Sequence, residues 1–337
     1  MARTDTLTHF LTDIASAIRK KKGSNSTISA ADFDTEINNI ASPANLKFTS
    51  YNCSVYPETV DFSWLNTKNY TDMSYMFNDT QIENIIADFD LTNTTTCQLM
   101  FGGYNSQNQK LETVKFKGRN CQNLTSISGL GYGNSKLKKI DVEFENVTHL
   151  TDVSNLISMY SSPLEELKFK LTNSNLLTKT NFLSVSGGNS TLKKINIDIS
   201  GMDSVTNIDG LGGYATTNIE EYSVNIHDTD FTNLVSVKNL GQIRSLNVTE
   251  LDFSWLYTPN VTDMSYSFSA AGLERLDIRN VDFSNVTTTT GMFSNSSATT
   301  PTNCLIIVKD QAAKTWLATN FSSYTNVKTV DELGGNE

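Results

Sequence analysis

A six-residue motif recurs through the middle of the chain with its charges inverted from one copy to the next. Each copy has an aliphatic residue, two charged residues and then alternating apolar positions: LKKIDV at 137–142, LEELKF at 164–169, LKKINI at 192–197 and IEEYSV at 219–224. If the copies are parallel strands stacked in register about 4.8 Å apart, each charged pair lies beside pairs of the opposite sign. The sequence therefore predicts a structural charge ladder of Lys138, Lys139, Glu165, Glu166, Lys193, Lys194, Glu220 and Glu221.

Two series of anchor positions, almost all of them apolar, set the length of the repeat. One series starts the strands and the other follows the opposite turn, and both recur about every 27 residues between residues 46 and 303. Such a period predicts a single solenoid rather than separate globular domains. The strand anchors are Ile82, Leu111, Leu137, Leu164, Leu192, Ile219, Ile243 and Leu273, and the second series is Tyr70, Thr94, Leu124, Leu150, Leu177, Val205, Leu234, Val261 and Val286.

The repeat motifs resemble those of a known family. The segments NVTDMSYSF at 260–268, YTDMSYMF at 70–77 and LDIRNVDFSNV at 276–286 are similar to BspA-like leucine-rich repeats of bacterial surface proteins. The similarity is strong at both ends of the array and degenerate between about residues 100 and 250. It implies a repeat solenoid with a parallel β stack on one side and mostly irregular or short helical segments on the other.

The first 45 residues read as a separate two-helix module. Residues 5–22 have an apolar face and a lysine-rich C-terminal end, and a second helix begins with Ser29 as its N-cap. The spacing is that of a coiled-coil seam, although two heptads are too few to fix an oligomer state. We expect a homo-oligomer, preferably a trimer, and the alternative is simple docking on the solenoid. The predicted attachment and oligomerisation residues are Leu7, Leu11, Ile14, Ile18, Phe33 and Ile37.

This N-terminal string, LTHFLTDIASAIRKKKGSNSTISAADFDTEINNI, resembles the N-terminal segment of baseplate and tail-fibre proteins from tailed phages and prophages of Gram-positive bacteria. The resemblance covers about the first 42 residues. It implies an end that attaches the chain to phage baseplate or tail proteins.

The C-terminal residues, 304–337, break the repeat. Residues 305–308 (LIIV) predict a last strand, and Asp310 is placed to cap a helix that runs to about Thr319. A stacked edge left open invites aggregation, so a strand-helix cap followed by a short tail is the expected end of the array.

Composition excludes several partners and locations. The net charge of −10 and the pI near 4.9 argue against nucleic-acid binding, and no apolar run is long enough to cross a bilayer. Thr8 and His9 interrupt the apolar stretch at the N-terminus, so we expect no secretory signal. We therefore expect the protein to be synthesised in a cytoplasm. The four cysteines, at 53, 97, 121 and 304, have no metal-ligand spacing, and we expect neither a metal nor a cofactor.

No catalytic motif is present, and the chain is not expected to be an enzyme. The three histidines lie in separate contexts, and there is no nucleophile elbow, P-loop or zinc motif. The acid pairs Asp88/Asp90 and Asp228/Asp230 have the spacing for glycosidase carboxylates, but turn-forming aspartate is the favoured interpretation.

A set of tyrosines is the predicted ligand-binding edge. Each follows the second anchor of its repeat, so the rings recur along one edge beside polar residues such as Asn134, an arrangement suited to stacking on glycans. The alternative is that each ring packs over its own loop. The set is Tyr104, Tyr132, Tyr160 and Tyr214.

Together these features predict a phage virion tail or baseplate fibre component that binds a host cell-surface glycan or protein through a leucine-rich-repeat solenoid. Such a protein is located in the virion tail and is assembled in the host cytoplasm. The alternatives are a structural virion or head-fibre protein without receptor binding, a bacterial surface adhesin and a polysaccharide-degrading tail enzyme.

Overall fold

In a computed structural model the chain divides into two units, Met1–Ser162 and Pro163–Glu337. In the part of the chain that the structure describes, no helix has the length and apolarity needed to span a bilayer. The described residues are 12, 14–16, 18–20, 27–29, 57–78, 80–102, 110–156, 163–178, 191–211, 218–294 and 299–334.

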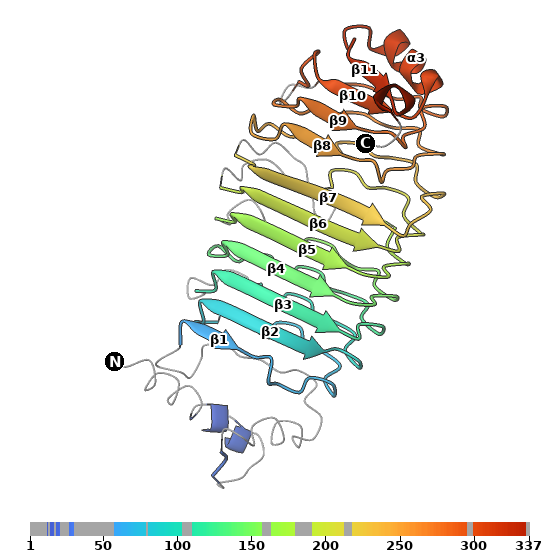
Figure 1. Ribbon diagram of the computed structural model, residues 1–337. Helices are drawn as coiled ribbons and strands as arrows, with labels where there is room; N and C mark the ends of the chain where they lie inside the picture. The colour runs from blue at the N-terminus through green and yellow to red at the C-terminus, as the bar shows by residue number, and fades with distance from the viewer. Residues whose placement is uncertain are drawn as a thin grey trace. The chain divides into compact units, whose positions relative to one another are not determined.

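The first unit is built from parallel strands, each contributed by one coil of the chain (Figure 1). Their order in the sheet follows their order in the sequence, and each residue pairs with its counterpart one coil later, as Phe116 does with Val142. Glu112 and Lys138, in contact across two such coils, are 26 residues apart. The strands are β1 (Thr59–Asp61), β2 (Asn84–Asp90), β3 (Thr113–Arg119) and β4 (Lys139–Phe144).

The second unit repeats this construction in two parallel sheets (Figure 1). One contains β5 (Glu166–Leu171), β6 (Lys194–Ser200) and β7 (Glu221–His227). The other contains β8 (Glu250–Asp252), β9 (Arg275–Asp277), β10 (Leu305–Val308) and β11 (Val327–Thr329), also in sequence order. The predicted repeat solenoid is therefore confirmed.

Alternation along each strand places one set of side chains inside the coils. In β2, Ile85, Ala87 and Phe89 are buried, whereas Ile86 and Asp88 point outward. Both anchor series are buried throughout, except that Val286 is only half-buried. Aromatic rings from successive coils contact one another inside the first unit, and Phe77 stacks on Phe101 at a centroid distance of 5.6 Å.

The turn opposite the strands contains a left-handed residue in the coils where the structure describes it. In the first unit the residues at this position, all with positive φ, are Tyr75, Leu99, Gly129 and Asn155. In the second unit they are Gly210, Asn239, Tyr266 and Gly291. Glycine adopts this conformation without steric cost, which explains the glycines in the degenerate middle repeats. The larger residues at the equivalent places are strained.

The C-terminal segment closes the second unit. The predicted strand is β10, and the predicted helix is α3 (Gln311–Asn320), whose first turn is capped by Asp310 through a 3.0 Å hydrogen bond from the Ala313 amide. The chain then adds β11 and a short 3₁₀ helix, η3 (Asp331–Leu333), which the sequence did not predict.

Little of the N-terminal module is described. Residues 12, 14–16 and 18–20 are helical, and Ile14 and Ile18 are buried. The remaining predicted attachment residues, Leu7, Leu11, Phe33 and Ile37, lie outside the described residues, as does the second predicted helix after Ser29.

Candidate binding surface

The outer face of the strands carries paired charges in both units. In the second unit the sheet register places Lys194 between Glu166 and Glu221. Lys194 Nζ lies 2.5 Å from Glu221 Oε1, and Lys193 Nζ lies 3.6 Å from Glu220 Oε1. Glu165 accepts the amides of Lys193 and Lys194 through its backbone carbonyl. These residues of the predicted ladder therefore lie together.

In the first unit the lysine pair has a partner that the sequence reading missed. Lys138 Nζ lies 2.7 Å from Glu112 Oε2, and Lys139 lies in register with Thr113. Glu112 follows the anchor Leu111 in the preceding coil, so the repeat itself contained the signal. The predicted neighbours Glu165 and Glu166 belong to the other unit.

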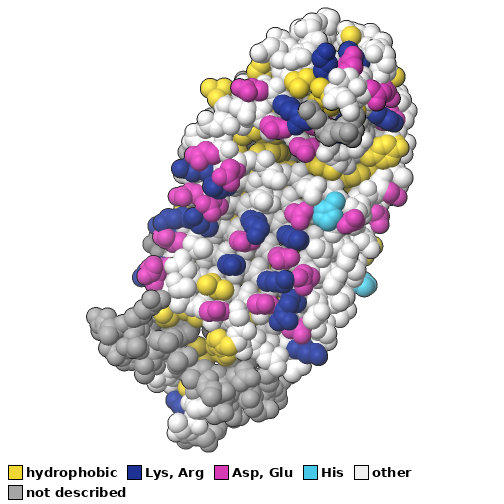
Figure 2. All heavy atoms as spheres, viewed as in Figure 1, with side chains coloured by type: hydrophobic (Ala, Val, Ile, Leu, Met, Phe, Trp, Pro, Cys, Tyr) yellow, Lys and Arg dark blue, Asp and Glu magenta, His cyan; other side chains and the backbone are white. Residues whose placement is uncertain are grey.

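The next outward position of each strand continues these ion pairs. Lys117 Nζ lies 2.6 Å from Glu145 Oε1 and 3.8 Å from Glu143 Oε2, and the hydrogen bond to Glu145 raises the pKa of Lys117. In the second unit Asp198 lies within 3.5 Å of Lys170 Nζ and 3.3 Å of His227 Nε2. Lys/Arg and Asp/Glu side chains are accordingly intermixed over this face (Figure 2), which offers no field of a single sign.

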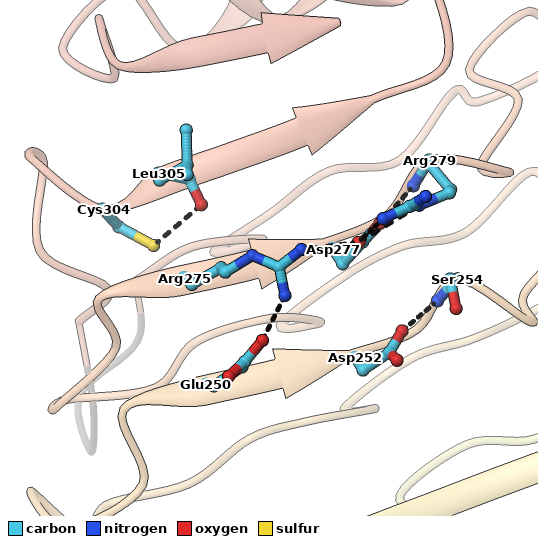
Figure 3. Close-up of polar contacts among 8 residues, drawn as sticks. All are labelled: Glu250, Asp252, Ser254, Arg275, Asp277, Arg279, Cys304 and Leu305. Atoms are coloured by element: carbon cyan, nitrogen blue, oxygen red, sulfur yellow. Dashed lines mark hydrogen bonds and ion pairs between the residues drawn. The ribbon is translucent and has the colours of Figure 1, made fainter. Parts of the chain in front are cut away.

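A tighter ionic cluster lies on the second sheet of the second unit (Figure 3). Arg279 Nε donates to both carboxylate oxygens of Asp277, at 2.9 and 3.1 Å, and Arg275 Nη2 lies 3.3 Å from the same group. Arg275 also pairs with Glu250 on the neighbouring strand. Asp277 is 1% exposed, although it lies between Asp252 and the buried Ile307 on the outward side of the sheet. The Asp277 carboxylate is paired with Arg275 and Arg279, so the cluster stabilises the coil rather than presenting a ligand site.

The predicted tyrosine edge is described at one position only. Tyr132 is half-buried, whereas Tyr104, Tyr160 and Tyr214 lie outside the described residues. Asn134, which the sequence analysis placed beside this edge, is not available to a ligand. This residue is 2% exposed, and its amide donates to the Leu111 carbonyl at 3.2 Å because the neighbouring coil closes over it.

The two acid pairs are engaged with neighbouring residues. Asp88 binds Arg119 at 2.5 Å, and Asp230 accepts the amide and hydroxyl of Thr232. Burial raises the pKa of Asp90, but hydrogen bonds from Thr92 and Asn120 outweigh it, and the net pKa lies below the usual value. Among the described residues no group of three or more His, Cys, Asp or Glu side chains is placed to hold a metal.

A column of threonines at the opposite turn is a second regular surface, and it was also missed. Thr71, Thr95 and Thr125 are exposed, and each later hydroxyl donates to the preceding carbonyl of the column at 3.0 Å. Asparagines two positions earlier bridge coils in the same way: Asn123 Nδ2 donates to the Thr92 carbonyl at 2.8 Å. The Asn-x-Thr spacing, which recurs at Asn69-x-Thr71, Asn93-x-Thr95 and Asn123-x-Thr125, was the available signal.

The family model described as "Mycoplasma protein of unknown function, DUF285" matches residues 34–142 and 214–304, more than half of the chain. The chain belongs to this family. The DUF285 match contains both ends of the array, where the repeat motifs are strongest, and leaves out the degenerate residues 143–213.

A comparison with curated proteins finds no match to this DUF285 chain. Among solved structures, the crystal structure of the pneumococcal vaccine antigen PcpA is similar over 85% of this chain and 82% of that chain, with 12% identity and a TM-score of 0.28. A likeness at this TM-score bears on neither the fold nor the function of the DUF285 chain.

Proposed function

We propose that this DUF285 solenoid is a binding protein that recognises a bacterial cell surface, and that it is a component of a phage virion tail or baseplate fibre. The observation that supports binding is the regular outer surface: each coil adds one row of polar and paired charged side chains to the strand face. Repeated weak contacts along such a surface, multiplied by the copies in an assembly, give avidity through effective concentration.

The virion assignment is supported by the N-terminal resemblance to phage tail proteins. In this proposal residues 1–45 join the chain to baseplate or tail proteins and to further copies of itself, preferably as a trimer. The solenoid contacts a host cell-surface glycan or protein without cleaving it, binds no nucleic acid and inserts into no membrane. The protein is assembled in the host cytoplasm and is located in the virion tail.

Incubation of the purified full chain with cell-wall polysaccharide of Gram-positive bacteria tests the binding function. Retention of the protein with no release of oligosaccharide is the expected result. Released oligosaccharide would instead indicate a degrading enzyme, and neither retention nor release would indicate a structural protein.

Deletion of residues 1–42 tests the attachment role. Because these residues form the proposed virion-attachment end, the deleted chain is expected to be absent from purified virions while its circular dichroism still shows the folded solenoid. Unchanged incorporation into virions would contradict the attachment role.

A bacterial surface adhesin is the second candidate, favoured by the family description, which names a bacterium, and by the BspA-like repeats. The location of the protein distinguishes a phage fibre component from a bacterial adhesin. An antibody against the solenoid should label purified virions if the chain is a fibre component and the surface of uninfected cells if it is an adhesin.

A further inference from the structure

A cleft of about 340 Å³ lies between the last full repeat and the C-terminal cap of the second unit. One side is formed by residues 281–284, which follow β9, and the other by residues 309–316, at the start of α3. Its volume is within the range of small-ligand sites, which begins at about 300 Å³.

Three charged side chains line the cleft, Asp282, Lys309 and Asp310, and none of them has an ion pair among the described residues. Asp310 caps α3 through the Ala313 amide, which leaves Asp282 and Lys309 as the pair of opposite sign. Asp282 Oδ1 accepts the amide and the hydroxyl of Ser284, but Oδ2 has no hydrogen-bond partner among the described residues. Lys309 makes no hydrogen bond within the same part of the chain. Both side chains line the same cleft. The hydrogen bonds from Ser284 lower the pKa of Asp282, and the charge of Lys309 lowers it further.

Both sides of the cleft also contribute apolar side chains. Val281 and Ala312 line it together with Trp316. The indole ring of Trp316 is half-exposed and stacks on Phe283 at 4.4 Å with an interplanar angle of 8°, which fixes its orientation. The indole N–H has no partner among the described residues, so it remains available as a donor.

We propose that this cleft binds a neutral sugar, one or two pyranose units of a larger glycan. A pyranose has an apolar C–H face that suits the indole side and hydroxyl groups that both donate and accept hydrogen bonds. Its hydroxyls donate to Asp282 Oδ2 and accept from Lys309 Nζ, and a neutral ligand needs no counter-charge from a cleft that contains charges of both signs. The inference rests on the proposed surface-binding function for the source of the glycan and gives that function a defined site.

Ligand-observed NMR with the purified full chain tests the site. The probes are the methyl glycosides of glucose, galactose and N-acetylglucosamine, with glucuronic acid as an anionic probe and glycylglycine as a zwitterionic one. At least one neutral glycoside is expected to bind, with a dissociation constant on the order of 1 mM. Lys309→Ala and Asp282→Asn should each weaken it about tenfold, because each removes one charge-assisted hydrogen bond.

Lys136→Ala is the matched control, because Lys136 is exposed and does not line the cleft. It should leave sugar binding unchanged, and all three variants should keep the wild-type unfolding midpoint. No binding of any neutral glycoside, binding by the two cleft variants as tight as that of the wild type, or preferential binding of glucuronic acid or glycylglycine would each overturn the proposal.

Cell-wall retention of the same variants separates this site from the proposed function. If the cleft variants no longer bind sugar but the wild type was never retained on cell walls, the site stands and the surface-binding function fails. If retention persists although no glycoside binds, the function stands and the site fails.

Discussion

Single residues in the opposite turn decide whether neighbouring coils can approach each other. Gly291 has φ +64°, and a Cβ added there would lie 2.5 Å from Tyr266 Cδ1 and 2.6 Å from the Ser294 carbonyl oxygen. The position therefore demands glycine for two reasons: the left-handed backbone and the contact with the preceding coil.

We predict that Gly291→Ala lowers the free energy of unfolding by about 2 kcal/mol or more, from the left-handed strain and the clash together. Gly334→Ala is the matched control, because Gly334 has φ +90° but no atom within 4 Å of an added Cβ. It should lose no more than about 1 kcal/mol. Urea unfolding followed by circular dichroism measures both, and equal losses would contradict the role of coil contact.

Some of the conformations and burial of single residues were predictable from the sequence, and others were not. The paired Gly129-Leu130-Gly131 indicated a tight turn, and Gly129 has positive φ. The burial of Asn134 was not predictable, because its partner is the carbonyl of Leu111, 23 residues earlier. The partner of its amide group therefore belongs to the preceding coil.

At the scale of the elements, the charges of adjacent strands are matched across the sheet. Lys117 on β3 lies in register with Asp88 on β2 and Glu143 on β4. We predict that Lys117→Glu, which brings carboxylates together on three strands, lowers the free energy of unfolding by about 1 kcal/mol at low salt, the size expected for half-exposed charges.

The loss should shrink in 0.5 M salt because screening weakens the repulsion. Lys136→Glu makes the same charge change at an exposed side chain with no ion pair among the described residues, and it should cost less. Urea unfolding midpoints of both variants at low salt and in 0.5 M salt measure this salt dependence. A salt-independent loss would mean that the strands are not coupled by charge.

The Asp277 cluster belongs to the same scale, since it joins β8 to β9. Asp277→Ala removes a buried carboxylate from two arginines, and we predict a loss of about 3 kcal/mol in unfolding free energy. Asp252→Ala, at the position in register one strand earlier, removes only an exposed turn acceptor for the Ser254 amide and should cost about 1 kcal/mol or less. Thermal and urea unfolding measure both variants. Equal losses of unfolding free energy would contradict the stabilising role of the buried carboxylate.

The strands were predictable from their alternation, but this cluster was overlooked. Arg275 and Asp277 are spaced two apart, so they share one face of β9, and Arg279 follows two residues later, in the turn after the strand. The sequence contained that signal. The burial of Asp277 on the outward side was not predictable from its own strand, because the neighbour in register on the other side is the buried Ile307 of the C-terminal cap.

At the scale of the whole molecule, both the proposed binding surface and the cleft depend on coils that stack in register. The period of about 27 residues predicted this stacking, since each coil must return to the same place to bury its anchors. Among the candidate sites the charge ladder followed from the period, but the cleft did not. It forms between a repeat and a cap that is not part of the repeat pattern.

Spin labels on adjacent strands test the register most directly. Lys168→Cys and Asn196→Cys place labels on paired residues of β5 and β6, whereas Lys168→Cys and Ser223→Cys place them two strands apart. With Cys53→Ser in the background, the buried Cys97, Cys121 and Cys304 should stay unlabelled. Strands about 4.8 Å apart predict strong dipolar broadening of the electron paramagnetic resonance spectrum for the first pair and weaker broadening for the second. No broadening for residues 168 and 196, or stronger broadening for 168 and 223, would contradict the stacked solenoid.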